Sequence, residues 1–180
     1  MPTMTPAPLR SRPAADEHLP YYERYIALVP EGDVLATLEE QVRETVALLA
    51  GLDEQEAAYR YAPGKWSVKE VVGHVSDTER VFGYRALCAA RGEAAALPSM
   101  EQDDYVANGN FDARTLGSIL DELTAVRQGT LALFRSMDDA VLARRVIASG
   151  APVTARALAW MIAGHERHHQ RGLREHYLTR

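Results

Sequence analysis

The chain has a single cysteine, Cys88, among its 180 residues. No disulfide can therefore form within it, and a lone thiol is typical of proteins in a reducing compartment. No apolar run approaches the roughly 20 residues that a membrane-spanning helix needs. The first 20 residues also lack the apolar core of a secretory signal. We therefore expect a cytoplasmic protein that has no membrane partner.

Positive charge is also scarce. The 20 Lys and Arg residues are outnumbered by 25 Asp and Glu residues, which gives a net charge of −5. Proteins that bind nucleic acid usually carry a basic face or stripe, so this balance argues against a nucleic-acid partner. Hydrophobic residues make up 47% of the chain and charged residues 25%. These values and the length of the chain predict one globular domain with a sizeable core.

Proline is concentrated at one end of the chain. Five of the nine prolines lie in residues 1–20, which predicts an irregular N-terminal arm followed by a domain over residues 21–180. In that domain, apolar residues recur at spacings of three and four in four segments, which predicts amphipathic helices over 33–50, 67–90, 112–137 and 154–178. Ser67 and Glu70 have the spacing of a capping box at the start of the second helix. Only residues 141–147 favour a short extended piece.

Four amphipathic helices of about five turns each predict an all-α fold, a four-helix bundle. The connection over residues 92–111 is too long for a simple turn between antiparallel helices. We therefore expect it to cross the bundle, so that the second and third helices run in the same direction.

Histidine is concentrated at the other end, where residues 164–178 hold four of the six. His165 and His169 share one helix face, and the apolar spacing turns that face toward the core. His74 lies at the edge of the apolar face of the second helix. Three imidazoles from two facing helices can give a divalent metal three ligands and an open position. Hydrogen-bonded or surface histidines are the alternative interpretation.

Residues 165–169 also form an HExxH motif, in which two histidines bind zinc and the glutamate activates water. A metzincin needs a turn and a Met-turn further along the chain, but only five residues follow Glu175. A protease of this type also needs an edge strand that holds an extended substrate, and the sequence predicts none. We therefore reject this class.

Three stretches carry a resemblance to a known family: PGKWSVKEVVGHVSDTER (63–80), EQDDYVANGNF (101–111) and AGHERHHQRGL (163–173). They resemble the DinB/YfiT-like family of metal-dependent enzymes, and the resemblance covers most of the chain. It implies a four-helix bundle with a long crossover between the second and third helices. It also implies one divalent ion, nickel or zinc, whose ligands are the three residues that the helical pattern selects: His74, His165 and His169.

Family members include S-transferases that use bacillithiol or mycothiol, and a maleylpyruvate isomerase. The resemblance therefore implies a thiol S-transferase or a hydrolase that acts on a small electrophilic molecule. It also implies a low-molecular-weight thiol such as bacillithiol as co-substrate, and a homodimer. The alternative is a non-catalytic metal-binding protein of the stress or DNA-damage response.

Three further side chains are catalytic candidates. Asp77 follows His74 by three residues and could accept a hydrogen bond from a histidine ring or pair with an arginine. Arg127 lies on the apolar face of its helix, so we expect it to be buried beside Asp77 or an acid of residues 101–104. A clamp for an anionic ligand is its alternative role. Glu166 is a candidate base, although it points about 100° away from the preceding histidine.

Overall fold

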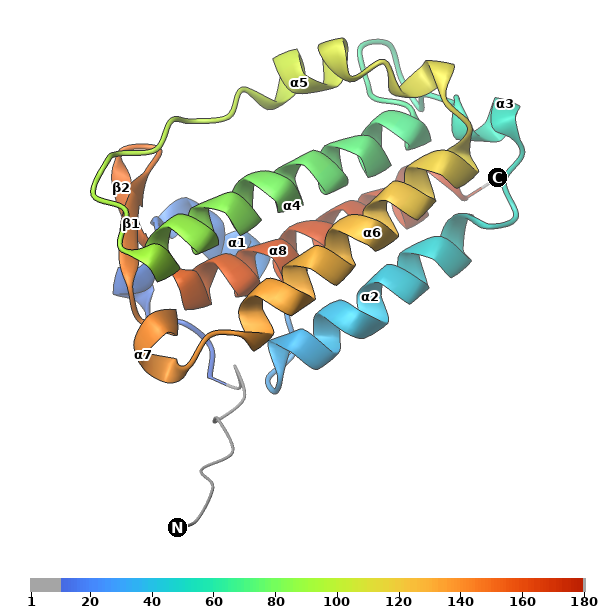
Figure 1. Ribbon diagram of the computed structural model, residues 1–180. Coiled ribbons are helices and arrows are strands. Elements are labelled where there is room, and N and C mark those ends of the chain that lie inside the picture. The colour runs from blue at the N-terminus through green and yellow to red at the C-terminus, as the bar shows by residue number, and fades with distance from the viewer. Residues whose placement is uncertain (1–10, 180) are drawn as a thin grey trace.

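Four long helices form the body of the computed structural model, which describes residues 11–179 (Figure 1). They are α2 (Val34–Leu49), α4 (Val68–Arg91), α6 (Leu116–Arg135) and α8 (Ala155–Gly172). Both α2 and α4 pack against α6 and α8, so the helices close a bundle in the order α2, α6, α4, α8. This arrangement confirms the predicted four-helix bundle.

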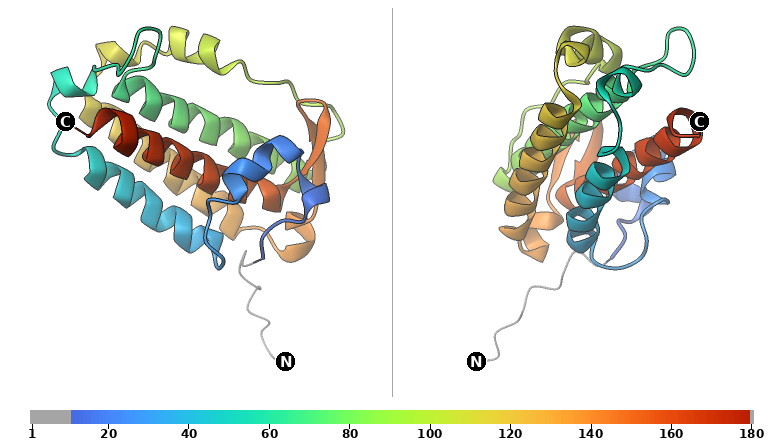
Figure 2. Two further views of the ribbon diagram at one scale, coloured as in Figure 1. Left: turned by 180° about the vertical axis from the view of Figure 1, so that it is seen from behind. Right: turned by 90° about the vertical axis from the view of Figure 1, so that its right-hand side faces the viewer.

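The chain between α4 and α6 crosses the length of the bundle (Figures 1 and 2). This crossover contains α5 (Gln102–Gly109), which packs against α4, and the 3-10 turn η3 (Phe111–Ala113). It returns the chain to the end where α4 began. Helices α4 and α6 therefore run in the same direction, as the length of the connection predicted, and α2 and α8 run in the opposite one.

Short elements connect the long helices. Helix α3 (Glu54–Ala57) precedes α4, and α7 (Asp139–Leu142) follows α6. Strands β1 (Arg145–Ala148) and β2 (Ala151–Thr154) pair as an antiparallel hairpin that leads into α8. The sequence predicted an extended piece near β1 but missed β2, because its four residues include a proline and are too few to show alternation.

Side-chain caps set where the long helices begin. In each of the four, a side chain just before the first turn accepts a hydrogen bond from a backbone amide of that turn: Asp33, Ser67, Thr115 and Thr154. The predicted capping box of Ser67 and Glu70 is present. The Thr115 cap starts α6 four residues later than predicted. Asp112, the first residue of the predicted helix, lies in η3 and accepts hydrogen bonds from Arg60 and Ser67. The last predicted helix ends as a π-helical turn, η4 (Leu173–Tyr177).

Buried apolar side chains form two clusters along the bundle axis. Phe134 and Trp160 belong to the cluster at the hairpin end, and Leu123 and Phe111 belong to the cluster at the other end. Within residues 11–179, no helix is both long enough and apolar enough to span a membrane.

The described part of the N-terminal arm, residues 11–20, contacts the bundle; residues 1–10 lie outside the described chain. It contains the 3-10 turn η1 (Ala15–Glu17), and a second 3-10 turn, η2 (Pro20–Tyr22), begins at its last residue. Arg12 donates hydrogen bonds to the carbonyl oxygens of Ile26 and Val29. The carboxylate of Glu17 is buried and accepts a hydrogen bond from the Thr154 hydroxyl. These contacts fix the position of the next element, α1 (Glu23–Ile26).

Helix α1 packs closely against α8 at Gly164. A Cβ atom on Gly164 would lie 2.1 Å from the carbonyl oxygen of Tyr25. The next residue of α8 is His165, and its ring centroid lies 5.5 Å from that of Tyr25, in an edge-to-face contact. The missing side chain at residue 164 therefore allows α1 to cover the histidines.

Gly164→Ala is expected to lower the free energy of unfolding by at least about 2–3 kcal/mol, because the new methyl group overlaps backbone atoms. Gly129→Ala is the matched control, since Gly129 is an exposed α6 residue whose Cβ would meet nothing within 4 Å. That change should be neutral or stabilise the helix by up to about 1 kcal/mol. Urea unfolding measures both variants, and a fully stable Gly164→Ala protein would contradict the close packing of α1 on α8.

Candidate metal centre

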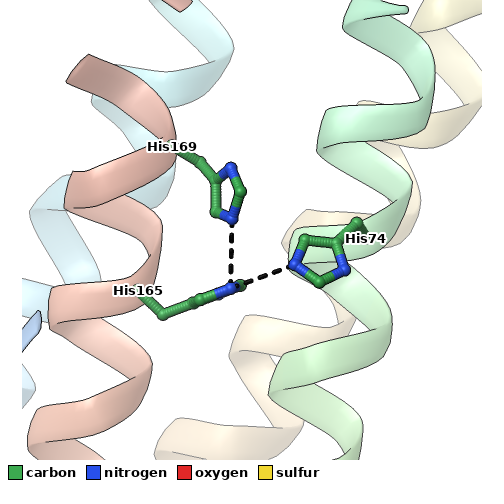
Figure 3. Close-up of side chains that lie close together, drawn as sticks. All are labelled: His74, His165 and His169. Atoms are coloured by element: carbon green, nitrogen blue, oxygen red, sulfur yellow. Dashed lines mark hydrogen bonds between the residues drawn. The ribbon is translucent and has the colours of Figure 1, made fainter. Parts of the chain in front are cut away.

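Three histidine rings converge between α4 and α8 (Figure 3). The Nε2 atom of His165 lies 3.1 Å from Nε2 of His74 and 3.1 Å from Nε2 of His169. One ligand atom from each residue lies within 4.8 Å of the other two. The structure thus brings together the three histidines that the sequence pattern selected.

Helix geometry and ring packing hold these imidazoles in place. His165 and His169 are four residues apart, so they lie one above the other on the same face of α8. His74 faces them from α4, which packs along α8. The Trp66 ring lies 4.7 Å from the His74 ring, and Tyr25 contacts His165. The two aromatic rings therefore cover part of the cluster, in which His74 and His165 are buried and His169 is half-buried.

Burial keeps the three imidazoles neutral. Burial, and to a lesser extent the nearby His168, lowers the pKa of His74 to about 4. Burial and then the other histidines lower the pKa of both His165 and His169 well below the ordinary value. A neutral imidazole has a lone pair on one ring nitrogen, which is the form that binds a metal ion.

The positions of the nitrogens fit a divalent metal. Imidazole nitrogens lie about 2.0–2.1 Å from zinc, and tetrahedral geometry then separates two such nitrogens by roughly 3.3 Å. The two Nε2 separations of 3.1 Å are close to this value. The other ring nitrogen of His74, Nδ1, lies 3.5 Å from the Thr78 hydroxyl, which can help to fix the ring. Three protein ligands would leave one position open.

Asp77 pairs with an arginine, which is the second of the two roles that the sequence allowed. Its carboxylate accepts a hydrogen bond from Arg80 at 3.2 Å, as an ion pair on the surface of α4. The hydroxyl that lies near Nδ1 of His74 belongs to Thr78 instead. Burial raises the pKa of Asp77, and the neighbouring Arg80 opposes that shift.

A buried ion-pair network links all four long helices. Arg127 of α6 is 1% exposed and donates from Nε and Nη2 to the two carboxylate oxygens of Glu79 on α4, both at 2.8 Å. It also donates to Glu166 of α8 at 2.7 Å and to the carbonyl oxygen of Leu38 on α2 at 2.6 Å. The Thr45 hydroxyl of α2 donates to Glu166 at 2.6 Å. The guanidinium therefore has partners on three helices besides its own.

The buried position predicted for Arg127 is confirmed, but its predicted partners, Asp77 or an acid of residues 101–104, were wrong. The burial of its partner Glu79 could have been predicted in the same way, because Glu79 follows Val75 by four residues on the apolar face of α4. Glu166, the candidate base and the glutamate of the HExxH motif, is held inside the bundle by Arg127.

Two pockets contain different members of the histidine cluster. The larger, of about 660 Å³, is lined by His169 together with Trp66 and Arg24. The smaller, of about 300 Å³, is lined by both His74 and His165. Small molecules in the two pockets would therefore reach the histidine cluster by different routes.

The family model of the DinB superfamily matches residues 37–172, which span α2 to α8 and include all three histidines. The chain belongs to the DinB superfamily. No curated protein matches its sequence.

Two solved structures share this DinB-type fold. YfiT from Bacillus subtilis, described as a probable metal-dependent hydrolase with an unusual four-helix bundle topology, superposes with a TM-score of 0.66 at 16% identity. The match covers 89% of this chain and 87% of YfiT. The mycothiol-dependent maleylpyruvate isomerase gives a TM-score of 0.63 at 14% identity, and the match covers 76% of this chain and 58% of the isomerase. At these identities the similarity establishes a common fold.

Proposed function

We propose that this chain is a metal-dependent enzyme that holds one divalent ion, nickel or zinc, on His74, His165 and His169. The observation that carries the proposal is the convergence of three neutral imidazoles whose Nε2 atoms are 3.1 Å apart in two of the pairs. Burying polar rings against one another is unfavourable unless their nitrogens find partners. A metal ion would satisfy one nitrogen of each ring.

The proposed reaction is the transfer of a low-molecular-weight thiol such as bacillithiol to a small electrophile, or the hydrolysis of that electrophile. A divalent ion at this site would lower the pKa of a water molecule or a thiol. The only cysteine, Cys88, is buried and lies 14 residues beyond His74 on α4, about 21 Å along the helix axis. A small molecule must therefore bring the nucleophile, and the mycothiol dependence of the similar isomerase supports a thiol.

The side chains around the cluster would bind and orient the substrates. The larger pocket has the volume of a site for a small molecule, and Arg24 and Lys65 add positive charge to its lining. Burial and a hydrogen bond with Tyr21 raise the pKa of Tyr25 to about 12, so its hydroxyl stays protonated at neutral pH. The proposed setting is the reducing cytoplasm, where such thiols are available. The proposed assembly is the homodimer that the family resemblance implies.

Turnover of monochlorobimane with a panel of thiols tests this function. The zinc- or nickel-loaded protein should conjugate the dye to one of bacillithiol, mycothiol or glutathione at least about tenfold faster than the buffer control, a modest acceleration for an enzyme. The His74→Ala variant should lose this activity. A fully metal-loaded protein that accelerates neither conjugation nor hydrolysis of a panel of activated esters would contradict the proposal and favour the non-catalytic alternative.

A further inference from the structure

A buried arginine that forms no ion pair lines the smaller pocket. Arg85 of α4 is 4% exposed. Its Nη2 atom donates to the carbonyl oxygen of Pro98 at 2.8 Å and to the Ser149 hydroxyl at 3.1 Å. Both partners are neutral, and no carboxylate within residues 11–179 forms an ion pair with Arg85.

The charge of Arg85 is therefore not compensated by the described protein. An anion stabilises a largely buried guanidinium, because neutral hydrogen bonds replace only part of its hydration. Arg127, which is buried more completely, has two carboxylate partners. Glu101 lines the same pocket as Arg85 but is exposed. The contrast indicates that Arg85 is positioned to meet an anion from outside the chain.

The β hairpin holds the guanidinium in position. Its turn consists of Ser149 and Gly150, which have positive φ angles of 52° and 80°. Two-residue turns of this kind favour asparagine, aspartate or glycine, because a positive φ is strained for other side chains. A serine occupies the strained position, and its hydroxyl accepts a hydrogen bond from Arg85. The serine at this position therefore does not suit the turn, but its hydroxyl binds Arg85.

One aromatic ring separates Arg85 from the histidine cluster. The Phe82 ring centroid lies 5.8 Å from the Arg85 guanidinium carbon and 6.3 Å from the His165 ring. Tyr22 packs edge-to-face against Phe82, at 6.0 Å between ring centroids. The pocket of about 300 Å³ thus has a cation, an aromatic wall and two of the clustered histidines, His74 and His165, in one lining.

We propose that this pocket binds a small aromatic or unsaturated carboxylate. The carboxylate pairs with Arg85, the flat body lies against Phe82 and Tyr22, and the far end faces His74 and His165. The inference rests on the proposed function, because it names the substrate class of that enzyme. It also assigns the electrophile to the smaller pocket and leaves the larger pocket, which contains His169, for the thiol.

Calorimetric titration of the zinc-loaded protein with benzoate and with its neutral analogue benzamide tests the proposal. The wild-type protein should bind benzoate at least about tenfold more tightly than benzamide, because the neutral amide leaves the buried charge of Arg85 without a counter-ion. Arg85→Gln should remove this preference, and Ser149→Gly, which removes the hydroxyl and relieves the turn, should weaken benzoate binding several-fold. The control variant Arg80→Gln, in an exposed arginine of the same helix, should bind benzoate like the wild type.

Equal affinities of the wild-type protein for benzoate and benzamide, or no benzoate binding, would overturn the proposal without any variant having to fold. An Arg85→Gln protein that keeps the full benzoate preference would also overturn it. Zinc content is measured in the same samples. A protein that binds no zinc but still prefers benzoate through Arg85 would refute the metal-dependent function. It would not refute the proposed binding of a carboxylate in this pocket.

Discussion

His74→Ala is expected to lower the affinity for zinc by more than about 100-fold, since even the loss of a group that only supports a metal ligand weakens binding 10- to 100-fold. The change removes the only proposed ligand on α4 and leaves His165 and His169 alone on α8. Two imidazoles on one helix would hold the ion with two open positions. Elemental analysis and competition with a chromophoric chelator measure the loss, and circular dichroism should show an unchanged helical content.

His168→Ala is the matched control for this experiment. His168 is adjacent to His169 in the chain, but it is exposed and does not belong to the cluster. Its loss should leave the zinc affinity within about twofold of the wild type, because its ring contacts that of His169 but contributes no nitrogen to the cluster. A His74→Ala protein that keeps the affinity of the wild type would exclude the three-histidine site.

The sequence predicted the bundle and the histidine cluster because both depend on local periodicity. Four apolar stripes predicted the four helices. The length of the connection after α4 predicted that α6 runs in the same direction as α4. The spacing of His165 and His169 alone predicted that they share one helix face, because this depends on no neighbouring helix. His74 was found because it lies beside the apolar stripe of α4.

The contacts of buried charges could not be predicted in the same way. Arg127 was expected to be inside, but its partners depend on the level at which α4 and α8 meet α6, and periodicity does not fix that level. Arg85 was missed, although it follows Phe82 by three residues on the same face of α4. Its significance emerges only when the hairpin brings Ser149 to it across 64 residues of sequence.

The network at Arg127 leads to a second large expected effect, on stability. Arg127→Met should lower the free energy of unfolding by about 3–5 kcal/mol, because it leaves two carboxylates buried without a cation. Glu79 and Glu166 are both 1% exposed at the side chain, so water cannot replace the guanidinium. Arg127→Lys should be intermediate, since it keeps the charge but loses the two-pronged contact with Glu79. Urea unfolding at neutral pH measures both variants.

Replacing all three charged residues of the network separates the energy of the ion pairs from that of the packing. A variant with apolar residues at Glu79, Arg127 and Glu166 should recover much of the stability that Arg127→Met loses, because buried ion pairs often contribute little more than well-packed apolar groups. Arg80→Met, in an exposed arginine on α4, should change stability by less than about 1 kcal/mol. If Arg127→Met is as stable as the wild type, the two carboxylates must reach water or take up protons, and the ion-pair network cannot be what joins the four helices.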